Sequence, residues 1–84
     1  MSDYPIIFTR SAQKELNSLP IEISSRLSSK IDALVNEPRP VGCLKLKGRQ
    51  NQWRIRVGDY RIIYSIDDDT IIINILEVRH RREA

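Results

Sequence analysis

Residues 53–64 carry the pattern that most constrains the fold of this 84-residue chain. Apolar side chains alternate with arginines from Trp53 to Val57, which predicts a strand with one buried face. Gly58 and Asp59 follow as a two-residue turn with glycine in the first central position, the type II′ pattern of a β-hairpin. This turn predicts the register of the two strands, which pairs Val57 with Tyr60, Arg56 with Arg61, and Ile55 with Ile62.

The predicted register places three arginines on one face of the hairpin: Arg54, Arg56 and Arg61. Like charges directly opposite one another destabilise a sheet, and a chain that needed only stability is expected to carry opposite charges or threonine there. Arginine is well suited to bidentate contact with phosphate. We therefore interpret this face as a candidate anion-binding surface, with an ordinary solvated face as the alternative.

The N-terminal half predicts a strand followed by two helices. Residues 5–9 are a short β-prone run, and Ser11 is a plausible N-cap for a helix over 11–19. Pro20 suits the first turn of a second helix, which cannot continue past Pro38. The apolar stripe of this second helix consists of Ile23, Leu27, Ile31 and Leu34.

The C-terminal half reads as antiparallel sheet. A short strand over 43–47 precedes the hairpin, and a last strand begins after the polar turn at 67–70. This last strand is apolar at nearly every position, which is typical of a central strand covered on both faces. The sequence thus predicts one α+β domain over residues 1–84, in the order β-α-α-β-β-β, with a four-stranded antiparallel sheet packed by a helical hairpin.

Composition limits the function classes. The formal net charge is +3, and residues 43–84 hold nine basic and six acidic side chains, which favours an anionic polymer or an acidic partner. The single cysteine, Cys43, excludes an internal disulfide and a Cys-rich zinc site, and we expect no metal site. No apolar run approaches the roughly 20 residues of a membrane helix. We expect a cytoplasmic protein that does not contact a membrane.

Three segments resemble a known family: KLKG at 45–48, WRIRVGDYRIIY at 53–64 and LEVRHRRE at 76–83. They are similar to the RelE/ParE superfamily of bacterial toxins, and most of all to its RelE branch. The resemblance implies a RelE-like fold and a toxin of a type II toxin–antitoxin system. It also implies ribosome-dependent cleavage of mRNA in the A site by a ribose 2′-OH, which inhibits translation and requires no metal or cofactor.

The resemblance further implies the roles of individual residues. Arg54 and Arg56 match two basic residues of the family, usually lysines, while Arg61 and Arg81 match phosphate-stabilising arginines. Arginine stays protonated in proteins and is a poor base. His80 is the one side chain here that ordinarily exchanges a proton near neutral pH, so it is the candidate acid–base residue.

Further basic residues are candidates for contact with RNA or the ribosome: Lys45, Lys47, Arg49 and Arg82. For the two lysines, protection of an edge strand is an equal alternative. The expected partners are a cognate antitoxin, the ribosome and mRNA. The toxin–antitoxin complex is expected to bind its own operator DNA through the antitoxin.

Two other functions remain open at this point. The RelE branch often carries a tyrosine a few residues after its last arginine, and this sequence reaches Ala84 without one. A ParE-like inhibitor of DNA gyrase is therefore an alternative, although gyrase inhibition does not call for converging phosphate stabilisers. The other is a catalytically inert member that acts only in a repressor complex.

Overall fold

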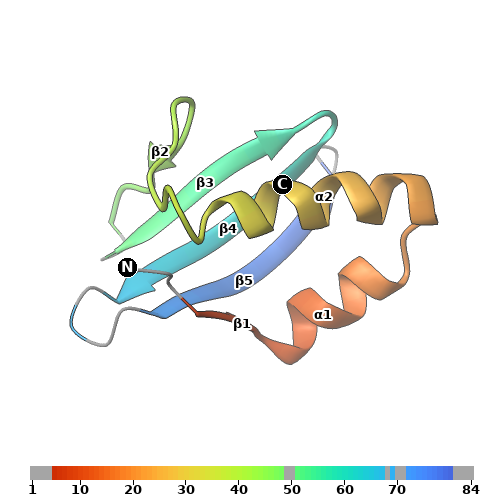
Figure 1. The fold of residues 1–84 in the computed structure, drawn as a ribbon, viewed down its shortest axis with the longest axis horizontal. Coiled ribbons are helices and arrows are strands. Elements are labelled where there is room, and N and C mark those ends of the chain that lie inside the picture. The colour runs from red at the N-terminus through yellow and green to blue at the C-terminus, as the bar shows by residue number, and fades with distance from the viewer. Residues whose placement is uncertain (1–4, 49–50, 68, 70–71, 81–84) are drawn as a thin grey trace.

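The computed structural model describes residues 5–48, 51–67, 69 and 72–80 of the chain. Two helices and five strands follow one another along these residues (Figure 1). In chain order they are β1 (Ile6–Phe8), α1 (Arg10–Asn17), α2 (Ile21–Ala33), β2 (Leu44–Lys45), β3 (Gln52–Val57), β4 (Tyr60–Asp67) and β5 (Ile72–His80). The predicted α+β class is confirmed, and the sheet has five strands instead of four.

β1 is the strand predicted over 5–9, and it lies at one edge of the sheet. The strands are arranged in the order β1-β5-β4-β3-β2, so β5 is an inner strand although it comes last in the chain. β1 runs parallel to β5, with Ile6 opposite Ile73, whereas the other neighbouring strands are antiparallel. Pairing with β1 satisfies backbone groups that β5 would otherwise leave open at its outer edge. The sheet is therefore mixed at this edge.

The hairpin formed by β3 and β4 has the predicted register. Val57 lies opposite Tyr60, Arg56 opposite Arg61, and Ile55 opposite Ile62. Of the two residues at the turn, Gly58 alone has a positive φ, at 59°, as the type II′ geometry requires. A side chain is disfavoured at such a φ, so glycine at this position fixes both the turn and the register.

The core lies between the two helices and one face of the sheet. α2 crosses in front of the sheet in Figure 1, and both helices contribute to a single buried cluster. Its members are Ala12, Leu16, Leu27, Ile31, Leu34, Ile55, Val57, Ile62, Tyr64, Ile66, Ile73, Ile75 and Val78. In the part of the chain that the structure describes, no helix covers the opposite face, which we call the open face. The expectation that the last strand is covered on both faces is therefore wrong.

A β-bulge in β5 changes which side chains reach the open face. Tyr64 pairs with Ile75, but its neighbour Ile63 pairs with Glu77, so Leu76 is an extra residue in β5. Beyond this point the alternation of β5 is reversed. Val78 consequently enters the core, where it is 2% exposed, and the residues on either side of it turn to the open face.

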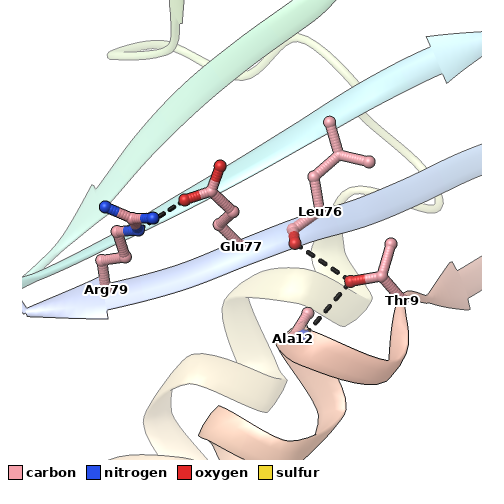
Figure 2. Close-up of polar contacts among 5 residues, drawn as sticks. All are labelled: Thr9, Ala12, Leu76, Glu77 and Arg79. Carbon is pink, nitrogen blue, oxygen red and sulfur yellow. Dashed lines mark hydrogen bonds and ion pairs between the residues drawn. The ribbon is translucent and has the colours of Figure 1, made fainter.

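The N-terminus of α1 is fixed to this bulge by Thr9. The Thr9 hydroxyl accepts a hydrogen bond from the Ala12 backbone N–H at 3.1 Å and donates one to the Leu76 carbonyl oxygen at 3.0 Å (Figure 2). Thr9 is thus the N-cap of α1. The prediction that Ser11 is the N-cap is wrong, since Ser11 lies inside the helix.

Candidate nucleic-acid interface

Three arginines form a continuous row across the open face. Arg56 on β3 lies opposite Arg61 on β4, and Arg61 lies opposite Arg79 on β5. Directly opposite residues in antiparallel strands are about 4.5–5.5 Å apart at their Cα atoms, so the three side chains project side by side. We call these three residues the arginine row. The row adds Arg79 on β5 to the predicted pair of Arg56 and Arg61.

The next row of the open face contains Arg54. From β2 to β5, this row consists of Leu44, Arg54, Ile63 and Glu77. The three arginines that the sequence assigned to one face, Arg54, Arg56 and Arg61, do share it. This shared face is the geometric condition for binding one anion with several guanidinium groups.

Glu77 partly balances the positive charge of this surface. Its carboxylate forms an ion pair with the Nε group of Arg79, drawn in Figure 2. Within the described ranges, Arg54, Arg56 and Arg61 have no carboxylate partner within salt-bridge distance. The open face therefore presents more guanidinium charge than carboxylate charge around the arginine row, which favours a polyanionic ligand.

Arg61 has an unusual environment at the centre of the row. Its Nε atom is buried and has no hydrogen-bond partner among the described residues. A buried donor without a partner costs about 1–3 kcal/mol. The flanking residues of the row are also cationic and therefore cannot accept a hydrogen bond from this donor. Arg61 is thus the member of the arginine row with a polar group that the described residues leave without a partner.

His80 lies away from the arginine row. It is opposite Tyr60, and the two rings meet edge to face with their centroids 5.1 Å apart. Like Val78 two residues earlier, His80 follows the helix-facing side of β5. The structure therefore does not bring the proposed acid–base residue together with the arginines on the open face.

The predicted lysines occupy a different region. Of the strand expected over 43–47, only Leu44–Lys45 forms β2. Lys45 is opposite Trp53, with its Nζ atom 5.9 Å from the centre of the indole ring, and the guanidinium of Arg39 lies 5.0 Å from the same centre. Trp53 is partly buried and packs against the core, as its alternation predicted. Lys47 is exposed.

The sequence analysis missed two basic residues that the structure places near predicted site residues. Three other predicted site residues lie in parts of the chain that the structure does not describe. Arg79 was missed because its position depends on the bulge in β5. Arg39 was missed because it reaches Trp53 from the loop that precedes β2. The remaining predicted site residues lie outside the described residues: Arg49, Arg81 and Arg82.

The turn before β5 has a local structural explanation. The backbone N–H of Asp69 donates a hydrogen bond to Asp67 Oδ1 at 3.1 Å, as in a common polar turn. Among the described residues, no group of three His, Cys, Asp or Glu side chains could hold a metal ion. Neither helix in these residues has the length and apolar character needed to cross a membrane.

Comparison with protein families and curated proteins gives consistent results. The family model described as "ParE toxin of type II toxin-antitoxin system, parDE" matches residues 6–84. Toxin RelE3 of Methanocaldococcus jannaschii is 33% identical over 81 residues, covering 92% of this chain and 90% of that protein. Toxin RelG of Mycobacterium tuberculosis is 32% identical over 81 residues, covering 95% and 93%.

Solved structures show the same fold. A chain of the archaeal RelE–RelB complex from Pyrococcus horikoshii has a TM-score of 0.85 and 34% identity, with 100% of both chains covered. A chain of the toxin–antitoxin complex RelBE2 from Mycobacterium tuberculosis has a TM-score of 0.80 and 32% identity, covering 94% of this chain and 99% of that one. This chain therefore belongs to the ParE toxin family of type II toxin–antitoxin systems, within the RelE/ParE superfamily that its motifs resemble.

Proposed function

We propose that this toxin is a ribosome-dependent endoribonuclease that cleaves mRNA in the A site and thereby stops translation. The observation that carries the proposal is the arginine row, with Arg61 at its centre, whose Nε donor has no partner in the part of the chain that the structure describes. A surface of this kind matches the charge of an RNA backbone, since phosphate oxygens accept bidentate hydrogen bonds from guanidinium groups. The similarity to proteins named as RelE and RelG toxins agrees with this choice of substrate.

The chemistry that suits this surface is attack of a ribose 2′-OH on the adjacent phosphate. Negative charge increases on the phosphate oxygens as the O2′–P bond forms, and fixed cations lower the energy of that transition state. Arg61 and Arg56 would contact these oxygens, and Arg54 would hold the neighbouring part of the backbone. The products are a 2′,3′-cyclic phosphate and a 5′-OH, and no metal ion takes part in the proposed reaction.

The proposal includes a cognate antitoxin as the physiological partner. The solved relatives include RelE–RelB complexes, so a partner of that kind is the natural expectation for this chain. An extended or helical acidic segment would suit a surface on which Arg54, Arg56 and Arg61 lack carboxylate partners among the described residues. The complex would bind its operator DNA through the antitoxin, and the toxin would act in the cytoplasm.

Cell-free translation with defined mRNA tests the function directly. Added toxin should stop protein synthesis, and mapping of the mRNA should show cuts within codons in the A site that end in cyclic phosphate. A parallel supercoiling assay with DNA gyrase tests the ParE-like alternative. Inhibition of gyrase without cuts in RNA would replace the proposal with that alternative, and inactivity in both assays would favour the inert repressor subunit.

A further inference from the structure

We propose that Glu77 is the general base of the cleavage reaction, the group that takes the proton from the attacking 2′-OH. This inference rests on the proposed endoribonuclease function. The reaction needs a base, and the arginines of the open face cannot supply one because they stay protonated in proteins. His80, the acid–base candidate from the sequence, follows the opposite face of the sheet. The open face must therefore supply another acceptor.

Glu77 has the required position. It lies on the open face opposite Ile63, one row away from the arginine row, and is two residues from Arg79 along β5. Arg61 is its diagonal neighbour on β4, and diagonal neighbours are about 7–8 Å apart, within reach of long side chains. A phosphate held by Arg61 thus brings the adjoining ribose beside the Glu77 carboxylate.

The alternative carboxylate on this face is too distant. Asp67 follows the same face of β4, but it is six residues from Arg61, which corresponds to about 20 Å along a strand. Asp67 also accepts the hydrogen bond that shapes the turn before β5. Among the described residues of the strands, Glu77 is therefore the carboxylate that a phosphate on the arginine row would meet.

The ion pair with Arg79 leaves Glu77 available for this role. The contact with Arg79 Nε uses one carboxylate oxygen, and Figure 2 shows the other oxygen pointing away from the guanidinium. The Glu77 side chain keeps 30% of its surface exposed. Arg79 therefore fixes the orientation of the carboxylate, while the second oxygen remains open to a hydroxyl group of the substrate.

Glu77 accepts the proton of the 2′-OH while the O2′–P bond forms, and Arg61 and Arg56 stabilise the charge on the phosphate oxygens. The P–O5′ bond then breaks, and the 5′ oxygen takes a proton from water. Glu77 returns its proton to solvent, so the protein is unchanged after the reaction.

Single-turnover cleavage on programmed ribosomes, with toxin in saturating amounts, tests this role with the full chain. Glu77→Gln keeps the shape of the side chain but removes the base, and we expect the rate constant to fall by about 10²–10⁴-fold. The toxin concentration at half-maximal rate should stay nearly constant. Added formate should partly restore the rate of Glu77→Ala, because it supplies a carboxylate to the vacated space. Glu22→Gln, which removes one exposed negative charge on α2, should cleave like the unchanged chain.

Each other outcome overturns the inference in a recognisable way. If Glu77→Gln cleaves as fast as the unchanged chain, Glu77 is not the base. If Glu77→Gln raises only the toxin concentration at half-maximal rate, and formate does not restore the rate of Glu77→Ala, Glu77 merely positions Arg79. If the unchanged chain itself does not cut mRNA, the proposed function fails, and the role of Glu77 fails with it.

Discussion

Arg61 lies directly opposite Arg79 where β4 and β5 pair, with Arg56 on its other side. Three guanidinium groups on adjacent strands repel one another, so this arrangement lowers stability unless an anion lies between them. The one ion pair of this row in the described structure joins Arg79 to Glu77. A surface that binds the phosphates of RNA would account for this arrangement. Substitutions in the row should therefore change both the cleavage rate and the stability of the protein.

Arg79→Ala should reduce cleavage although the sequence motifs did not select this residue. A charge-assisted hydrogen bond contributes about 1.5–3 kcal/mol, which corresponds to roughly 10–150-fold in rate. The measurement is mRNA cleavage on programmed ribosomes at equal toxin concentrations. Arg10→Ala removes the same charge from an exposed position at the start of α1 and should leave cleavage unaffected. Equal activity of both variants would exclude Arg79 from the site.

Arg56→Thr should make the protein more stable and less active. Threonine removes one like charge from the row and is favoured in strands, so we expect the free energy of unfolding to rise by about 0.2–1 kcal/mol. Urea denaturation measures this change. Added salt screens the repulsion between the arginines, so it should stabilise the unchanged chain more than the variant. A variant that is less stable at every salt concentration would show that Arg56 has a structural role.

The hairpin could be predicted because local chemistry determines it. Gly58 and Asp59 favour a type II′ turn, and that turn determines which residues of β3 and β4 lie opposite each other. No tertiary information is needed to place Arg56 beside Arg61. The parallel pairing of β1 with β5 could not be predicted in this way, since a strand as short as Ile6–Phe8 could join either edge of a sheet.

The face of the sheet on which Arg79 lies could not be predicted from the composition of β5. Apart from Asn74, the first five positions of this strand are apolar, so the alternation is too weak to show where the core-facing positions change. The buried positions in β5 are Ile73, Ile75 and Val78, a spacing that changes from two to three at the bulge. No glycine marks this bulge in the sequence, and the same change of phase places His80 on the helix-facing side.

Tyr64→Phe should destabilise the fold and alter its response to alkaline pH. The buried Tyr64 hydroxyl donates a hydrogen bond to the Pro38 carbonyl oxygen at 2.7 Å, and its loss should cost about 0.5–1.5 kcal/mol at neutral pH. Burial, with a contribution from the neighbouring Cys43, raises the pKa of Tyr64 far above the ordinary value near 10.

The sign of the pH effect follows from this shift. Above about pH 10 the unfolded chain loses the Tyr64 proton while the folded chain keeps it, so the free energy of unfolding decreases as pH rises. Tyr64→Phe should show a smaller decrease in urea denaturation at alkaline pH. Tyr60→Phe, at a half-buried position, should change stability by less than about 0.5 kcal/mol at neutral pH. An equal alkaline slope for Tyr64→Phe would contradict the prediction.

Thr9→Ala should separate α1 from the bulge. It removes the N-cap of α1 and leaves the Leu76 carbonyl oxygen without its donor, and we expect a loss of about 1–2 kcal/mol. In a domain of this size that corresponds to a fall in Tm of roughly 4–16 °C, which thermal unfolding measures. Thr9→Ser keeps the hydroxyl and should retain most of the stability. A similar loss in both variants would assign the effect to the methyl group of Thr9.

The central claim is that the reaction takes place on the open face of the sheet. The most direct test compares the cleavage rate of Arg61→Ala, a variant on the open face, with that of His80→Ala, a variant on the helix-facing side. With both variants folded, Arg61→Ala should lower the single-turnover rate on programmed ribosomes by about 10²–10³-fold, because the proposed role of Arg61 is to stabilise the charge of the transition state. His80→Ala should cleave at nearly the rate of the unchanged chain, because His80 follows the other face. A large loss in His80→Ala together with normal cleavage by Arg61→Ala would contradict the account and move the site to the side of the helices.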